Sequence, residues 1–434
     1  MNADALNPGG SDKRVARNIL IASIGNALEW FDFIAYGFLA ATIAKVFFPT
    51  GNEFSSMLLA TASFGVPFIV RPIGAVLIGR YGDRKGRKPA LTATVAMMLV
   101  GTLIIAVTPS YQAIGLLAPV LVVVARVIQG FAAGGEFGSA TAFLVEQNPS
   151  RRGFYGSWQF ASQSVSATLA AGIVWILFTA LPAEAITSWA WRIPFFLGLA
   201  IGPVGLLMRR SMHETDEFTA MQTTARDSEE QRSGTRGRVS AILICVGLVM
   251  GGTVASYVLG LYLPTFAIRR LHLPPTAAFA SATAVGVVSL IVCPLAGALS
   301  DRFGRRRVMS IGLVSAALTI MPTFSALLSH PTLTTLIICQ VAASFLLSFY
   351  TGPLAAAMAE IFSTRERTFG ISVGYNISVT VFGGFAPAIL TLLIHDTQSD
   401  MAPGWYALLA MIVSLASLAA VKKERSGRIL SADG

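Results

Sequence analysis

GRYGDRKGRK stands at residues 79–88 of this chain, and GALSDRFGRR stands at residues 297–306. The two stretches share one pattern, in which Gly, Asp, Arg, Gly and Arg recur at the same offsets. The matching residues are Gly79 and Gly297, Asp83 and Asp301, Arg84 and Arg302, Gly86 and Gly304, and Arg87 and Arg305. The copies lie 218 residues apart in a chain of 434, and long apolar runs flank each of them. This spacing predicts an internally duplicated chain embedded in a membrane.

The composition also indicates a membrane protein. Hydrophobic residues make up 54% of the chain and charged residues only 12%, about half the charged share of a soluble domain. Apolar runs of about 20 residues recur, and each could cross the membrane as a helix. Barrel strands would alternate apolar and polar residues, which these runs do not. We predict an all-α membrane protein with twelve transmembrane helices, at roughly 17–42, 55–80, 89–108, 112–146, 153–181, 190–208, 239–268, 276–300, 307–329, 332–361, 367–395 and 403–421.

The net charge of +10 is explained by membrane topology. When the predicted helices are drawn across a membrane, 26 of the 32 Lys and Arg fall on one side. Basic residues favour the cytoplasmic side, so both termini are predicted to be cytoplasmic. No nucleic-acid partner is needed to account for the charge; the lipid bilayer is the expected partner.

The duplication divides the chain into five predicted segments. They are a cytoplasmic N-terminal segment (1–16), a six-helix half (17–208), a polar cytoplasmic linker (209–238), a second six-helix half (239–421) and a cytoplasmic tail (422–434). No stretch is large enough for a soluble catalytic domain, so an enzyme is not expected. The four His residues lack metal-ligand spacing, so neither a metal nor another cofactor is expected.

Polar residues inside the predicted helices are the candidate functional residues, because a charge at the bilayer centre costs about 2.5–3.5 kcal/mol on insertion scales. Helix one places its polar residues within one arc of its surface, and the residues of helix four are similarly grouped. The candidates are Asn26, Glu29, Asp32, Tyr36, Arg71, Arg126, Gln129, Glu136, Gln159, Gln163, Tyr350 and Asn376.

Two interpretations of the deep charges remain open. In the first, Arg126 receives an anionic substrate while Glu29 or Asp32 carries a proton, because loss of the Arg to the substrate raises the acid's proton affinity. In the second, Glu29 and Arg126 form a structural ion pair that joins helices one and four. Glu136 is a further proton-coupling candidate, although its position at a helix end also fits gating or capping.

The remaining polar candidates also have two interpretations, contact with the substrate or packing between helices. Asn26, Tyr36, Gln129, Gln159, Gln163, Tyr350 and Asn376 are candidate substrate contacts. Amides in membrane helices also serve as hydrogen-bonding contacts between helices, so packing is the alternative for them. Arg71 precedes Pro72 and is predicted to have a structural or gating role.

The duplicated loops are predicted to form a gate. Asp83 and Asp301 could pair with basic side chains or with the exposed N-terminus of a neighbouring helix. A contact made in only one arrangement of the halves would bias a two-state equilibrium. The gating candidates are Arg71, Asp83, Arg84, Arg87, Asp301, Arg302 and Arg305. Topology alone would explain the basic residues, but not the repeated Asp and Gly.

These stretches resemble a known family. The duplicated loop resembles the signature of the major facilitator superfamily, and Arg126-Val-Ile-Gln129-Gly130 resembles its second motif, associated with proton transfer. GNALEWFDF at 25–33, RPIG at 71–74 and WRIPFF at 191–196 are similar to the metabolite–proton symporter branch. Within that branch, YQAIGLLAP at 111–119 and GGFAPA at 383–388 look most like citrate and tricarballylate transporters.

The resemblance implies a proton-coupled symporter that imports a di- or tricarboxylate by alternating access, driven by the proton gradient. Its expected location is the bacterial inner membrane, as a multi-pass monomer. The alternatives are a carrier of another small metabolite (α-ketoglutarate, shikimate, betaine or proline), an anion exporter, or a membrane sensor.

Overall fold

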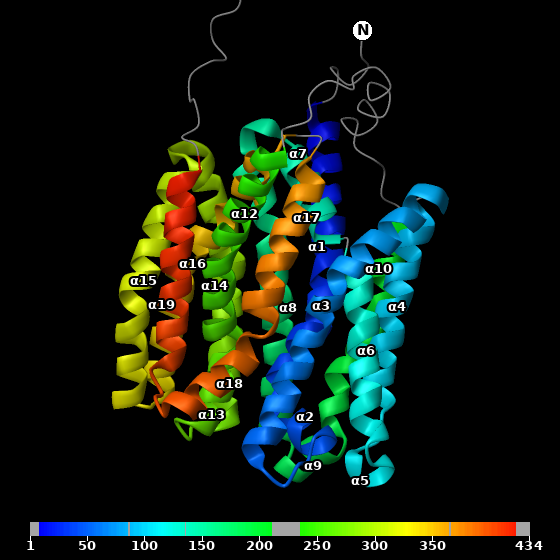
Figure 1. Cartoon of the computed structure of the whole chain (residues 1–434), viewed down its shortest axis with the longest axis vertical. Coiled ribbons are helices and arrows are strands. Elements are labelled where there is room, and N and C mark those ends of the chain that lie inside the picture. Colours follow the sequence, from blue (N-terminus) through cyan, green and yellow to red (C-terminus); the bar gives the residue numbers. More distant parts are fainter. Residues whose placement is uncertain (1–7, 86, 135, 211–234, 364–365, 422–434) are drawn as a thin grey trace, which may run out of the picture.

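We describe the chain from a computed structural model that covers residues 8–85, 87–134, 136–210, 235–363 and 366–421. Every regular element within these ranges is helical, so the predicted all-α class is confirmed for them. The helices run side by side along one direction and form a single bundle (Figure 1).

The first group of helices precedes the linker and lies on the right of Figure 1. Its elements are α1 (Pro8–Phe38), α2 (Ala40–Phe47), α3 (Glu53–Lys85), α4 (Arg87–Val107), α5 (Tyr111–Ile114), α6 (Leu117–Ala133), α7 (Glu136–Glu146), η2 (Pro149–Arg151), α8 (Arg152–Ala180), α9 (Ala183–Ser188), η3 (Ala190–Arg192) and α10 (Ile193–Arg210).

The second group follows the linker, and most of it lies on the left of Figure 1. Its elements are α12 (Thr235–Ser256), η4 (Tyr257–Tyr262), α13 (Leu263–Arg269), α14 (Pro275–Phe303), α15 (Arg305–Ser329), α16 (Leu333–Ile361), α17 (Arg367–Ser378), η5 (Val379–Gly384), α18 (Ala386–Thr397) and α19 (Ala402–Ala420).

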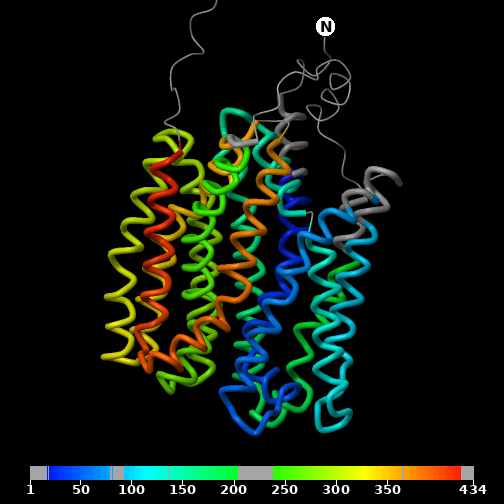
Figure 2. The backbone as a smooth tube through the Cα atoms, viewed as in Figure 1, coloured from blue at the N-terminus to red at the C-terminus, as the bar shows by residue number. Residues whose placement is uncertain are grey.

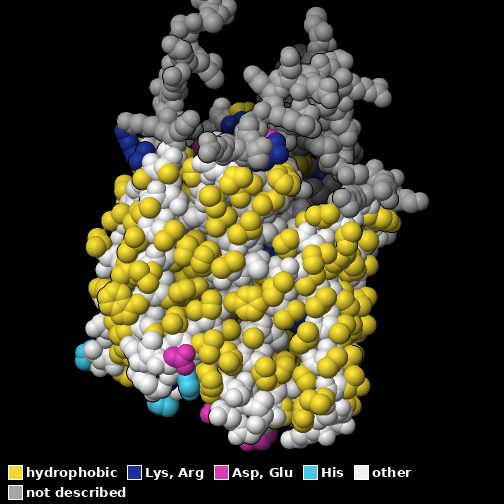
Figure 3. Space-filling view, in the orientation of Figure 1, with side chains coloured by type: hydrophobic (Ala, Val, Ile, Leu, Met, Phe, Trp, Pro, Cys, Tyr) yellow, Lys and Arg dark blue, Asp and Glu magenta, His cyan; other side chains and the backbone are white. Residues whose placement is uncertain are grey.

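The surface of the bundle is that of a membrane protein. Ten helices in the described ranges are long and apolar enough to cross a membrane. Large apolar side chains such as Leu318 and Ile311 point outward, and hydrophobic atoms cover most of the bundle's side (Figure 3). Lipid replaces water around such a surface, so it needs no polar covering. The two remaining predicted spans, 89–108 and 190–208, coincide with α4 and α10, and a total of twelve stays a prediction.

The two ends of the bundle differ in charge. α1 begins and α19 ends at the upper end in Figure 1, where the described Lys and Arg side chains also gather in Figure 3. We call this the basic end. The positive-inside rule predicts that it faces the cytoplasm.

Three predicted helices are less regular than expected. The predicted helix 112–146 comprises α5, α6 and α7. The predicted helices 239–268 and 367–395 contain the π-helical turns η4 and η5, and the chain bends between α17 and α18 (Figure 2). Gly383, Gly384 and Pro387 lie at that bend, and π-helical turns occur often at functional sites.

Glycine allows α3 and α6 to pack closely. A Cβ on Gly130 of α6 would collide with the backbone of Pro67 on α3. Close helix approach through small residues is typical of membrane bundles. This approach places Arg71 of α3 and Arg126 of α6 in one buried region, which the site below uses.

Candidate functional site

A central cavity lies between the two groups of helices. Its lining comes from α1, α3 and α8 of the first group and from α12, η4, α14 and α16 of the second. Its polar lining residues are Gln163, Ser164, Ser256, Tyr257, Ser289, Ser344, Ser348 and Thr351. No charged side chain is among the described residues that line it. The cavity therefore presents hydroxyl, amide and aromatic groups, and any charged side chain that influences it lies outside its lining.

Arg126 lies just outside the lining of the central cavity. Its side chain is fully buried, and its Nη2 donates to the carbonyl oxygen of Phe64, a cavity-lining residue, at 3.3 Å. The guanidinium carbon lies 4.4 Å from the ring centre of Tyr36 and 4.8 Å from that of Phe33. Within the described ranges Arg126 forms no ion pair, and its Nε has no hydrogen-bond partner. A buried cation without a carboxylate is costly, so this position favours an incoming anion.

A chain of hydrogen bonds connects Arg126 to Asp32. Arg126 Nη1 donates to Gln129 Oε1 at 2.9 Å, and Gln129 Nε2 donates to Thr102 Oγ1 at 3.0 Å. Thr102 in turn donates to Asp32 Oδ2. Asp32 is 6% exposed, and its Oδ1 has no hydrogen-bond partner among the residues that the structure describes. The predicted cation and one predicted acid are therefore coupled through two neutral side chains, and Thr102 is a member that the sequence did not reveal.

Glu29 belongs to a different charge pair. Arg71 Nη2 donates to Glu29 Oε1 at 3.3 Å, so the alternative that paired Glu29 with Arg126 is wrong. Arg71 is 1% exposed and lies 4.7 to 5.3 Å from the ring centres of Phe68, Phe33 and Trp30. Cation–π contacts of this kind help to compensate a buried guanidinium. The predicted structural role of Arg71 fits this pairing better than a gating contact.

The predicted contacts on α1 and α8 separate into two kinds. Asn26 Nδ2 donates to Ser162 Oγ at 2.7 Å and to the Gln159 carbonyl at 3.0 Å, and Gln159 Nε2 donates to Asn26 Oδ1 at 3.2 Å. Asn26 and Gln159 therefore join α1 to α8 and do not line the central cavity. Gln163 does line it, and its Nε2 has no hydrogen-bond partner within the described part of the chain.

Three other predicted substrate contacts are engaged in packing. The Tyr350 hydroxyl donates to the carbonyl oxygen of Leu248 at 2.5 Å, away from the cavity. Asn376 Nδ2 donates to the Gly134 carbonyl at 3.3 Å, which connects α17 to the end of α6. Tyr36 bonds to Ser63 at 2.6 Å and supports Arg126 through its ring. None of these three residues lines the cavity, so direct contact with a substrate held there is not supported.

The second charged loop makes the predicted helix-terminus contact. Asp301 accepts hydrogen bonds at 2.9 Å from the backbone nitrogens of Gly153 and Phe154, in the first turn of α8. Arg305 lies 2.7 Å from Asp301 and also pairs with Glu360. Gly304 has a φ of +89°, a backbone angle that glycine adopts readily and other residues rarely do. Asp301 thus joins the two groups of helices at the basic end, and Arg305 connects it to Glu360 within the second group.

The remaining gating predictions have different outcomes. Arg302 is exposed at the end of α14, and no ion pair joins it to another residue that the structure describes. Asp83 and Arg84 lie on α3 and Arg87 on α4, but their side chains lie outside what the structure describes. A contact that the sequence did not reveal joins Glu146 of α7 to Arg367 of α17 at 2.7 Å.

The opposite end of the bundle is also closed by contacts between the groups. Glu53 at the start of α3 pairs with Arg269 of α13 at 2.5 Å. The rings of Phe54 and His395 stack with their centres 3.8 Å apart. Contacts between the two groups are therefore present at both ends of the bundle, on either side of the central cavity.

Known proteins match this architecture. The model for the family "Sugar (and other) transporter" matches residues 18–239, and that for "Major Facilitator Superfamily" matches residues 281–429. The citrate-proton symporter of Salmonella typhi is 39% identical over 92% of both chains. This chain belongs to the major facilitator superfamily.

Other members of the superfamily are similar as well. The proline/betaine transporter of Escherichia coli K12 is 34% identical, over 93% of this chain and 83% of its own length. The alpha-ketoglutarate permease of the same strain is 33% identical over 99% of both chains. The E. coli xylose transporter XylE in a partially occluded inward-open conformation gives a TM-score of 0.77 at 17% identity, covering 96% of this chain and 100% of its own. As a superfamily member with transporter relatives, the chain is a multi-pass membrane transporter and not an enzyme.

Proposed function

We propose that this transporter is a proton-coupled symporter that imports a small di- or tricarboxylate, with citrate as the first substrate to test. The observation that carries the proposal is Arg126: a fully buried guanidinium, bonded to a cavity-lining residue and without an ion pair in the described ranges. Its position suits a substrate carboxylate that enters from the central cavity. The names of the citrate-proton symporters among its relatives agree with this chemistry.

The hydrogen-bond chain gives the proposal its coupling step. A substrate carboxylate at Arg126 would compete with Gln129 for the guanidinium and remove positive charge from the surroundings of Asp32. Asp32 would then bind a proton more readily, because less positive charge remains to favour its ionised form. Substrate and proton would therefore occupy the protein together, which is the requirement for symport. A substrate with a further charge would need Arg71 or a protonated carboxyl group, because an unpaired buried charge is unfavourable.

A second candidate is a symporter of a zwitterion such as betaine or proline. The lining of the central cavity favours it, since its described residues are uncharged and include the aromatic side chains Trp30, Phe64 and Tyr257. Aromatic faces bind quaternary ammonium groups through cation–π attraction. In this case Arg126 would still receive the carboxylate, and only the rest of the substrate would differ.

Uptake into proteoliposomes tests both candidates. With an acidic outer buffer, labelled citrate should accumulate, and a protonophore should abolish the accumulation. An excess of unlabelled betaine or α-ketoglutarate should compete only if the site accepts it. Absence of proton-driven uptake of every organic acid and zwitterion tested would contradict the proposal, and efflux under the same gradient would indicate an exporter.

We further propose that the transporter is a monomer of the bacterial inner membrane, with six helices in each half and the basic end in the cytoplasm. The proton gradient, and not a resident cofactor, would supply the driving force.

A further inference from the structure

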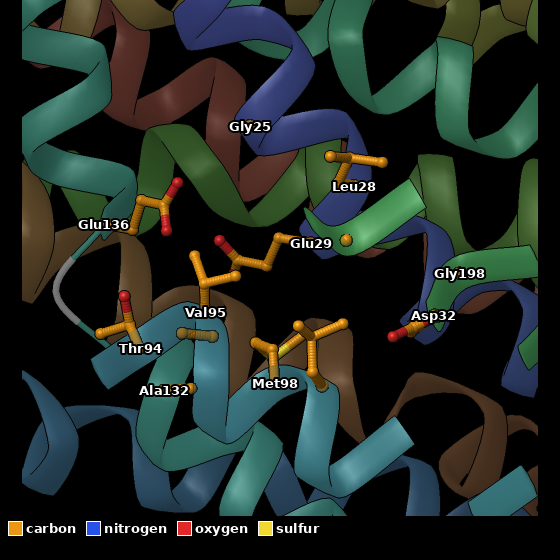
Figure 4. Close-up of a pocket in the computed structure, with 13 residues that line it drawn as sticks. Gly25, Leu28, Glu29, Asp32, Thr94, Val95, Met98, Ala132, Glu136 and Gly198 are labelled. Atoms are coloured by element: carbon orange, nitrogen blue, oxygen red, sulfur yellow. The ribbon is translucent and has the colours of Figure 1, made fainter. Parts of the chain in front are cut away.

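A second cavity lies wholly within the first group of helices. It is lined by α1, α4, α6, α7 and α10, and it shares no lining residue with the central cavity. Three carboxylic acids line it: Glu29, Asp32 and Glu136. We call it the acid-lined cavity (Figure 4).

The Asp32 carboxyl group is part of the lining of this cavity. Asp32 is only 6% exposed. Among the described residues its Oδ1 has no hydrogen-bond partner, whereas its Oδ2 accepts a hydrogen bond from Thr102. Figure 4 shows the Asp32 carboxyl group directed toward the cavity beside Gly198, with Glu29 and Glu136 facing each other farther along it. A buried carboxyl group that lines a small cavity is placed to exchange a proton with water or with another acid.

The cavity extends from Asp32 toward the basic end. Along α1 the lining runs from Asp32 back to Gly25, a rise of about 10 Å at 1.5 Å per residue. On α10 it runs from Gly198 to Gly202, toward the helix's basic C-terminus, and on α7 it reaches Glu136. Along all three helices the lining therefore extends toward the basic end of the bundle (Figure 1).

A cluster of aromatic side chains borders the central cavity, whose lining does not include Asp32. The rings of Phe33, Phe64, Phe68 and Trp30 contact one another, with centres 5.8 to 6.4 Å apart. Trp30 and Phe64 line the central cavity, whereas Asp32 does not. In this arrangement the Asp32 carboxyl group therefore lines only the acid-lined cavity.

We infer that Asp32 releases its proton to the basic end through the acid-lined cavity, with Glu136 as a relay, while the substrate leaves through the central cavity. This inference rests on the proposed proton coupling. The proton leaves the Asp32 carboxyl, passes through water and carboxylates of the cavity, and enters bulk water; no other bond changes. The other groups that face Asp32 or its partners are Glu29 of α1, Arg126 of α6, Arg71 of α3 and Thr102 of α4.

The test separates proton release from substrate movement. Glu136→Gln is reconstituted in proteoliposomes, and two rates are measured: citrate exchange across the membrane, and citrate-driven proton flux reported by a trapped pH-sensitive dye. Exchange should stay within about twofold of the wild-type rate, whereas proton-linked net uptake should fall by about tenfold or more, as loss of a proton-transfer group predicts. Glu136→Asp should restore most of the flux, and Glu184→Gln, at an exposed position on α9, is the matched control.

A second variant tests the cavity without removing a charge. A Cβ on Gly202 would collide with the Leu99 side chain, and both residues line the cavity, so Gly202→Ala should narrow it and slow proton flux selectively. Wild-type proton flux in both variants would overturn the inference, and so would an equal loss of exchange and flux in both.

Asp32→Asn distinguishes the two proposals. If this variant still accumulates citrate against a gradient, the proposed coupling itself fails. If it is uncoupled while Glu136→Gln and Gly202→Ala behave as wild type, only the release path fails.

Discussion

Replacing Asp301 by Asn should shift the transporter away from the arrangement in which the basic end is closed. The Asp301 carboxylate accepts two backbone hydrogen bonds from the first turn of α8 and pairs with Arg305. Hydrogen bonds to a charged group contribute about 1.5–3 kcal/mol each. Asn keeps one acceptor oxygen, but an NH2 group replaces the second. That donor would then face a backbone N–H, which is also a donor.

The expected loss follows from these contacts. One charge-assisted bond disappears and the remaining contacts weaken, so the closed state should lose about 2–4 kcal/mol relative to an open state that lacks them. At 1.4 kcal/mol for each factor of ten, this corresponds to a shift of about 30- to 700-fold in the equilibrium. When the closed state is only moderately favoured, a shift of that size makes the open state the more populated one.

Distance measurements between spin labels can detect the shift. Ser150 and Arg302 are exposed positions beside the contact and can be labelled in a background that lacks the three native cysteines. Asp301→Asn should add a longer distance, while Asp396→Asn, the same change at an exposed position on α18, should not. A distance distribution identical to that of the unmutated protein would refute the role given to Asp301.

Three further variants test individual assignments. Gln163→Ala should raise the KM for the transported acid about tenfold with little change in stability, because Gln163 lines the central cavity with a free Nε2; an unchanged KM in uptake assays would remove it from the site. Tyr350→Phe should lower the free energy of unfolding by about 1 kcal/mol and leave KM unchanged, since its hydroxyl donates to the Leu248 carbonyl and Tyr350 does not line the central cavity; thermal unfolding with uptake kinetics checks both. Thr102→Val should preserve citrate binding but weaken its coupling to protons by breaking the connection to Asp32; normal proton-driven accumulation would show that the connection is unnecessary.

The fold was largely predictable because lipid imposes simple constraints. Apolar runs long enough to cross a membrane must be helical, and the repeated loop indicates the duplication. The turns η4 and η5 were not predictable from apolar length. Their apolar composition is the same as that of a regular helix.

The candidate site was only partly predictable. Spacing along α1 placed Glu29 and Asp32 on one face, but it could not show which neighbouring helix supplies each partner. In the structure, Arg71 pairs with Glu29. Asp32 connects to Arg126 through Thr102 and Gln129. Thr102 has no distinguishing sequence signal, because a single Thr in an apolar helix commonly bonds to its own backbone.

The most direct test of the account is the number of protons taken up when citrate, or the best acid from the uptake screen, binds to the purified transporter. Calorimetry in buffers of different ionisation enthalpy measures both affinity and proton uptake. The unmutated protein should bind with proton uptake, Asp32→Asn should bind without it, and Arg126→Ala should not bind measurably, while Arg302→Ala serves as an exposed control. Near-normal affinity in Arg126→Ala would contradict the central claim that this buried guanidinium receives the substrate.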